Sequence, residues 1–169
     1  MSTKPRMTPR LISRDNSPDP RVAANDENPF RSRARPEGHA FCPSCKAVYN
    51  GSRWTWDLKP EDAHEHTCPA CVRIHDKFPA GYVTLKGEFL TKHRDEIMTL
   101  ITSTQDREKA ANPLQRIMAI EDIRDGLQVT TTDSFLARGI GEALQEAYKG
   151  DLKLRYSRDE NLLRASWKR

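Results

Sequence analysis

Hydrophobic residues follow a regular pattern only in the second half of the chain, from about residue 80 onward. Residues 81–87, Gly-Tyr-Val-Thr-Leu-Lys-Gly, alternate between apolar and polar positions, which is typical of a half-buried strand between two glycines. Between residues 92 and 110 the apolar positions recur at helical spacing, and Thr91 is the predicted N-cap. The pattern therefore predicts a strand followed by a helix, which Asn112-Pro113 ends.

A hairpin and a second helix are predicted next. Residues 114–123 and 127–131 have the composition of strands, and Asp125-Gly126 between them is a strong two-residue turn signal. Either Asp133 or Ser134 is expected to cap the following helix, which ends at Gly150. Its apolar residues fall at four-residue steps and form one stripe: Leu136, Ile140, Leu144 and Tyr148.

One or two strands complete the pattern, because two short segments near residues 152–156 and 163–167 alternate on either side of a polar turn. The resulting order is strand, helix, strand, hairpin, strand, helix and final strands. This order predicts an α+β domain over residues 79–169, a ferredoxin-like split β-α-β sandwich with both helices on one face of an antiparallel sheet.

The first 38 residues show no lasting hydrophobic period and contain six of the eleven prolines, so residues 1–38 are predicted to be a disordered basic tail. They carry eight Lys or Arg against five Asp or Glu, whereas residues 39–169 carry 20 against 19. Arg31, Arg33 and Arg35 are either part of a solvated linker or an arm that contacts phosphates. The net charge of +4 alone is a weak argument for nucleic acid.

Composition favours a cytoplasmic protein without a membrane partner. The chain is 36% hydrophobic and 31% charged, and no segment approaches the length that crosses a bilayer. The N-terminus also lacks the apolar stretch of a secretory signal.

All four cysteines of the chain fall in two pairs, Cys42-Pro43-Ser44-Cys45 and Cys68-Pro69-Ala70-Cys71. Two-residue spacing in both pairs, with 22 residues between them, predicts one tetrahedral site for Zn²⁺. Because four thiolates leave no position for water, the zinc is expected to be structural, folding a zinc-ribbon module over residues 39–78 independently of the α+β domain. Redox or disulfide chemistry and a histidine ligand are the alternatives, with His64, His66 and His75 as the candidate histidines.

Two tryptophans lie between the cysteine pairs in a module with few other apolar residues. They favour either base stacking on RNA, with basic neighbours contacting phosphates, or packing against the α+β domain. The predicted nucleic-acid-binding residues are Arg53, Trp54, Trp56 and Arg73, with Lys86 as a less certain neighbour.

No catalytic constellation is recognisable in the sequence, so an enzyme is not expected. The acidic cluster of Glu121, Asp122 and Asp125 is predicted to be a solvated hairpin rim; a small cation-dependent enzyme built on it is the weakest alternative. Gly139 and Gly141 are expected to permit close helix–sheet packing.

The run Cys68-Pro69-Ala70-Cys71-Val72-Arg73, which leads into the strand at residues 81–87, resembles the ribosomal export adaptor NMD family of archaea and eukaryotes. The similarity extends over residues 40–169, and the chain resembles a reduced, bacterial-style member of that family. It implies zinc binding and association with a ribosomal subunit. The chain departs from that family in having one set of four cysteines and no long C-terminal region, so export activity is not implied.

Together these patterns predict a zinc-stabilised RNA- or ribosome-associated protein. The alternative class is a protein–protein adaptor that docks a partner through the zinc ribbon and the open sheet face.

Overall fold

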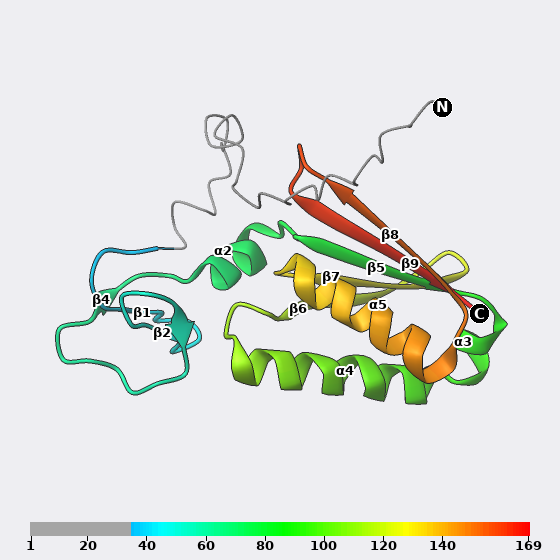
Figure 1. Ribbon diagram of the computed structural model, residues 1–169, viewed down its shortest axis with the longest axis horizontal. Helices are drawn as coiled ribbons and strands as arrows, with labels where there is room; N and C mark the ends of the chain where they lie inside the picture. Colours follow the sequence, from blue (N-terminus) through cyan, green and yellow to red (C-terminus); the bar gives the residue numbers. More distant parts are fainter. Residues whose placement is uncertain (1–34) are drawn as a thin grey trace, which may run out of the picture.

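Two separate β-sheets and four helices make up the part of the chain that the computed structural model describes, residues 35–169 (Figure 1). The predicted disorder of the tail, and the basic positions Arg31 and Arg33 within it, lie outside the described residues. Arg35, at the first described position, is exposed.

The smaller sheet lies in the cysteine-containing region and has the strand order β3-β2-β1-β4. Each of its strands is only two residues long, so alternation in the sequence could not reveal them. They are β1 (Ala40–Phe41), β2 (Val48–Tyr49), β3 (Trp54–Thr55) and β4 (His64–Glu65). The short helix α2 (Pro69–Asp76) follows, and the sequence pattern did not predict it either.

The larger sheet has the strand order β6-β7-β5-β9-β8. Its strands were all predicted, including both of the final ones, because each is long enough to show the two-residue period. They are β5 (Gly81–Lys86), β6 (Ile117–Ile123), β7 (Gly126–Thr131), β8 (Asp151–Ser157) and β9 (Leu162–Lys168). The hairpin turn lies one residue earlier than predicted: Asp125, at φ +61°, is its second residue, and Gly126 already pairs with Ile123.

The helices of this domain are α3 (Glu88–Lys92), α4 (Arg94–Ala111) and α5 (Ser134–Tyr148). Thr91 is not an N-cap, because it lies inside α3, a helix that the sequence pattern did not separate from α4. Asp133 does cap α5, since its Oδ1 accepts hydrogen bonds from the backbone N–H of Phe135 at 2.7 Å and of Leu136 at 3.2 Å.

Helices α4 and α5 lie side by side on one face of the larger sheet (Figure 1). The predicted stripe of α5 is buried through Leu144 and packs on alternate residues of the central strands. Trp167 of β9 is fully buried in this core, and its indole N–H donates to the backbone carbonyl of Lys149 at 2.7 Å. The largest members of the core are Leu85, Ile97, Ile101, Leu127, Leu136, Ile140, Leu144 and Trp167.

The prediction of an antiparallel sheet is wrong in one respect. Strand β9 lies between β5 and β8 and pairs with β5 in the parallel direction, Gly81 opposite Leu163 and Lys86 opposite Lys168. The sheet is therefore mixed, although its class, α+β, is as predicted. Pairing direction depends on tertiary contacts that the alternation of single strands does not encode.

Candidate metal centre

The first cysteine pair lies in the turn between β1 and β2. The backbone N–H of Cys42 donates to the carbonyl of Ala47 at 2.8 Å, and the N–H of Lys46 donates to the carbonyl of Cys42 at 2.9 Å. Lys46 has a φ of +68°, so the chain reverses sharply after Cys45. This tight turn aims both sulfurs to the same side.

The second pair lies at the start of α2. Cys68 is the N-cap of the helix, and its sulfur accepts a hydrogen bond from the backbone N–H of Cys71 at 3.4 Å. Pro69 occupies the first helical position, where its missing N–H costs no hydrogen bond. The helix start therefore holds the two sulfurs of this pair in a fixed relation.

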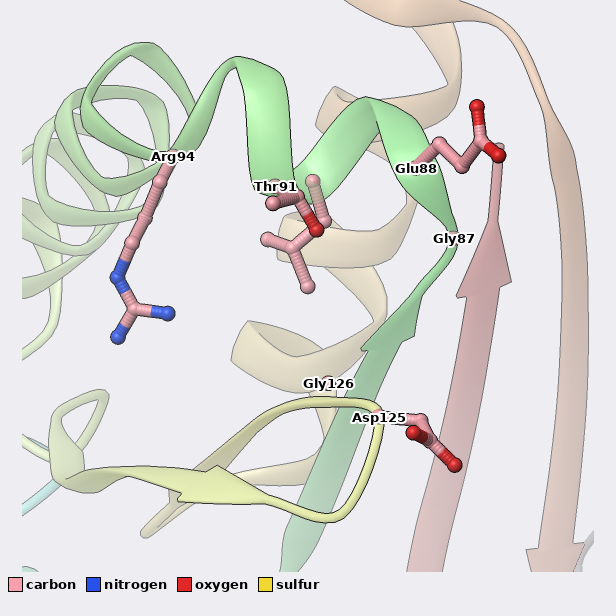
Figure 2. A pocket seen from close by; sticks show the side chains of 7 residues that line it. Gly87, Glu88, Thr91, Arg94, Asp125 and Gly126 are labelled. Atoms are coloured by element: carbon pink, nitrogen blue, oxygen red, sulfur yellow. The ribbon is translucent and has the colours of Figure 1, made fainter.

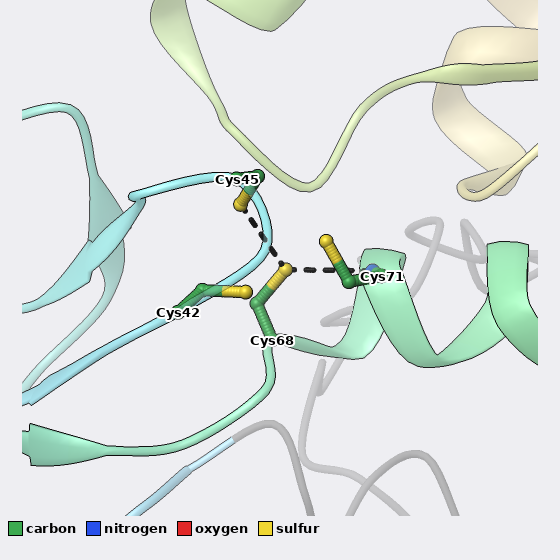
Figure 3. Close-up of side chains that lie close together, drawn as sticks. All are labelled: Cys42, Cys45, Cys68 and Cys71. Atoms are coloured by element: carbon green, nitrogen blue, oxygen red, sulfur yellow. Dashed lines mark hydrogen bonds between the residues drawn. The ribbon is translucent and has the colours of Figure 1, made fainter.

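The four sulfurs converge between the turn and the helix (Figure 3), and all lie within 4.8 Å of one another. The sulfurs of Cys45 and Cys68 are 3.7 Å apart. A tetrahedral ion with sulfur ligands at about 2.3 Å would place neighbouring sulfurs at about 3.8 Å. The cluster could therefore hold a metal ion such as zinc. Of the alternative ligands, none of the three histidines belongs to this cluster.

Arg116, just before β6, is a further member of the site. Its Nη2 donates to the sulfur of Cys68 at 3.2 Å and to that of Cys71 at 3.3 Å. The side chain is only 9% exposed, which requires a negative partner. The sequence patterns did not single out this residue, and a lone cation entering an apolar strand was the only local signal.

Thiol acidity in the cluster is strongly perturbed. Hydrogen bonding from Cys68 lowers the pKa of Cys45 to about 4, and the same bond, together with burial, raises the pKa of Cys68. Burial also raises the pKa of Cys71, although Arg116 donates to its sulfur. A bound metal ion would replace the remaining thiol protons, so metal binding at this cluster releases protons.

The predicted nucleic-acid-binding residues do not form one face. Trp54 is 4% exposed and packs between the rings of Tyr49 and His66, so it is not an accessible stacking surface. Arg73 is 8% exposed, and its Nη1 donates to the carbonyl of Phe78 at 3.1 Å. Trp54 belongs to the small core around the cysteines, whereas Arg73 is buried on α2, within the electrostatic reach of Asp133.

The other three predicted binding residues are accessible. Arg53 is exposed, and Trp56 is 40% exposed while its indole N–H donates to the carbonyl of Lys109 at 2.7 Å. Lys86 is exposed at the end of β5, in the other sheet. Nucleic-acid binding by Arg53, Trp56 and Lys86 stays a prediction.

An open hollow of about 480 Å³ lies beside the acidic cluster, between α3, the start of α4 and the β6–β7 turn (Figure 2). Asp125 and Arg94 line it. Asp122 forms an ion pair with Arg94 at 2.7 Å and Asp125 forms one with Arg124 at 4.0 Å, so two of the three predicted carboxylates already have a cationic partner. Glu121 and Asp122 do not line the hollow, so the cluster does not converge on it.

Comparison with known proteins identifies no relative, because the chain matches no protein-family model, no curated protein and no solved structure. The resemblance to the NMD family thus stays a prediction. Among residues 35–169, none of the helices has the length and apolar character needed to span a bilayer.

Proposed function

We propose that this chain is a zinc-stabilised RNA-binding protein that associates with ribosomal particles in the cytoplasm. The zinc part of the proposal is carried by the cluster of four cysteine sulfurs, two of which accept hydrogen bonds from Arg116. Four cysteines complete a tetrahedral shell, so the ion has no position for water or substrate and serves folding. Its binding free energy supplements the few apolar contacts of the small sheet.

RNA contact at the module rests on Trp56 and Arg53. A partly exposed tryptophan offers a face on which a base stacks, and an exposed arginine beside the same strand contacts phosphate.

For the fold of residues 79–169, we propose a ferredoxin-like sandwich with one added strand. The order along the chain, β5-α4-β6-β7-α5-β8, supports that assignment, and β9 is then a strand inserted between β5 and β8 in the sheet.

Zinc itself is tested by elemental analysis of the purified protein, with one zinc per chain as the expected result. Joint replacement Cys68→Ser and Cys71→Ser should abolish zinc binding, whereas Ser44→Ala, inside the first pair, should leave the zinc content unchanged. Full zinc retention in the double variant would refute the assigned ligands.

RNA binding is tested with ribosomal RNA over a range of salt concentrations. Trp56→Leu should weaken binding about tenfold, because stacking on an aromatic ring contributes about 1–3 kcal/mol per base. Trp56→Phe keeps a stacking ring but loses the hydrogen bond to Lys109, so it should bind almost as the wild type does. Leu58→Ala, at an exposed position of the same loop, is the matched control.

These experiments distinguish two roles of Trp56, stacking on a base and docking on α4 through the hydrogen bond to Lys109. Equal losses in Trp56→Leu and Trp56→Phe would show that Trp56 serves docking and not stacking. Wild-type protein that binds no ribosomal RNA and does not co-sediment with ribosomal subunits would overturn the RNA function.

A protein–protein adaptor is the second candidate, and exposed apolar side chains favour it. Ile74, Phe78 and Phe135 are exposed at the end of α2, just beyond it and at the start of α5. Binding through such side chains would depend little on salt, whereas RNA binding would weaken steeply through counterion release. Co-sedimentation with subunits that persists after ribonuclease treatment and in high salt would therefore favour the adaptor.

A further inference from the structure

The face of the larger sheet opposite α4 and α5 is polar and carries most of its charge on three neighbouring strands. In β5, Val83 and Leu85 are buried against the helices, so Tyr82, Thr84 and Lys86 point to the other side. In β9 the same alternation buries Trp167. Its neighbours of opposite orientation, Arg164, Ser166 and Lys168, are all exposed.

Strand register arranges these side chains in three rows across β5, β9 and β8. The first row is Tyr82, Arg164 and Arg155; the second is Thr84, Ser166 and Lys153; the third is Lys86, Lys168 and Asp151. Uncharged hydrogen-bonding groups therefore lie between two rows that carry most of the positive charge. Successive rows are about 7 Å apart, because a strand rises about 3.4 Å per residue.

Like charges stand directly opposite one another in this arrangement. Arg164 pairs with Arg155, and Lys86 pairs with Lys168. Directly opposed like charges destabilise a sheet, so these pairs are unfavourable for folding alone. Acidic side chains lie beside both pairs, because Asp151 is opposite Lys168 and forms an ion pair with Lys153 at 3.6 Å, and Glu160 forms one with Arg164 at 3.4 Å. These ion pairs are exposed and therefore contribute little.

An aromatic ring lies within the positive surface. Tyr82 is partly exposed in the first row, and the guanidinium carbon of Arg164 lies 5.3 Å from its ring centroid. Aromatic rings and arginine planes are the two surfaces on which unpaired bases stack. A base in a duplex is already stacked on its neighbours, so such a platform favours single strands.

We propose that this basic sheet face, defined as Tyr82, Lys86, Lys153, Arg155, Arg164 and Lys168, binds single-stranded RNA. The cations contact successive phosphates, and one base stacks on Tyr82 beside Arg164. Charge complementarity identifies a polyanion, and the aromatic ring selects a flexible strand with accessible bases. The choice of RNA rests on the proposed function, but the surface is separate from Trp56 and Arg53 and is tested separately.

The test uses the full chain and a fluorescently labelled uridine oligonucleotide of about ten nucleotides, close to the usual site size of such surfaces. Joint replacement of Arg155, Arg164 and Lys168 by Gln should weaken binding about 10- to 100-fold at low salt. The slope of log affinity against log salt should become about 2 smaller, because each lost single-strand phosphate contact removes about 0.7.

A control variant carries the same change in net charge on the helices. It replaces Lys92, Arg107 and Arg138 by Gln, all exposed and on α3, α4 and α5. This variant should bind nearly as the wild type does. Tyr82→Leu should weaken binding about tenfold while Tyr82→Phe should not, and a double-stranded competitor should displace the oligonucleotide poorly.

Equal weakening by the two triple variants, or no weakening by the sheet variant, would overturn the proposal. If the sheet variant loses zinc or no longer unfolds cooperatively, photo-crosslinking of 4-thiouridine RNA to the wild-type protein provides the test. Crosslinks in β5, β8 or β9 would support the proposal. Crosslinks confined to residues 39–78 would refute it. A deoxythymidine oligonucleotide distinguishes the hypothesis of a single-strand site on the sheet from the hypothesis of an RNA function. Binding of DNA but not RNA at this face would overturn the RNA function and keep the single-strand site.

Discussion

Arg116 connects the cysteine cluster to the larger sheet through its backbone as well as its side chain. Its N–H donates to the hydroxyl of Thr132 at 2.9 Å, and its carbonyl accepts from the N–H of Thr132 at 2.9 Å. These bonds fix the residue at the start of β6 and aim its guanidinium at Cys68 and Cys71. A buried arginine is tolerable only beside negative charge, and Cys68 and Cys71 would supply that charge as thiolates when a metal ion is bound.

Arg116→Gln should therefore lower zinc affinity about 10- to 100-fold, the usual effect of removing a hydrogen-bond donor behind a metal ligand. Competition with a chromogenic chelator measures this change. Arg124→Gln, in the exposed β6–β7 turn, should leave zinc affinity unaltered. An unchanged affinity in Arg116→Gln would show that the sulfurs hold the ion without help from the guanidinium.

At the scale of elements, glycine determines how closely α5 approaches the sheet. A Cβ on Gly81 of β5 would lie 2.4 Å from the Cβ of Ala137 and 2.5 Å from the Oγ1 of Thr131. Gly141 faces Leu152 of β8 in a similar way, as predicted for close helix–sheet packing. Gly139, by contrast, has no neighbouring atom within 4 Å of the position that a Cβ would occupy, so the prediction of close packing is wrong for this residue.

Gly81→Ala should lower the free energy of unfolding by about 1–3 kcal/mol, because the added methyl group forces α5 away from β5. Gly139→Ala should raise it by about 0.5–1 kcal/mol, since alanine favours a helix interior and meets no neighbour here. Urea unfolding followed by tryptophan fluorescence compares the two. Identical midpoints would mean that the helix–sheet contact adapts to the extra methyl group.

At the scale of the whole molecule, the segment 109–116 between α4 and β6 contacts the cysteine module at three points. Trp56 donates to the carbonyl of Lys109, Leu114 packs against the small core around the cysteines, and Arg116 contacts two sulfurs. This segment therefore depends on the cysteine module, whereas the core beneath α5 contains residues of the larger domain only.

Removal of zinc by a chelator should unfold residues 39–78 and expose the amides of the segment 109–116 to hydrogen exchange. The amides of α5 should stay protected, because their core keeps its contacts. The variant with Cys68→Ser and Cys71→Ser should show no further change with chelator. Loss of protection in α5 would mean that the α+β domain does not fold independently.

Much of this molecule could be predicted from sequence wherever a pattern is local. Strand β5 shows the two-residue period of a strand, and helix α5 shows the 3.6-residue period of a helix over several turns. The cysteine pairs indicate their site by spacing alone. The sequence could not distinguish Trp54 from Trp56, because both are aromatic and lie close together in a module whose strands have only two residues. Burial of the first depends on Tyr49 and His66, which tertiary contact brings together.

Two other features escaped prediction because they depend on distant partners. Arg116 lies 48 residues from Cys68 in the sequence, and only the fold brings them into contact. The alternation of β9 is the same whether it pairs at an edge or in the middle of the sheet, so its parallel partner could not be inferred. The basic sheet face follows from that register and was likewise out of reach, apart from Lys86.

The internal position of β9 in the sheet, between β5 and β8, has a consequence for folding during synthesis. Strand β5 leaves the ribosome early, but its second neighbour, Leu162–Lys168, is synthesised about 80 residues later. At about 5–20 residues per second, one edge of β5 stays unpaired for on the order of 4–16 s. During that interval the nascent chain exposes a strand edge and the apolar residues that later contact Trp167. The last strand therefore closes the domain, and a ribosome that stalls before residue 162 holds a chain prone to aggregation.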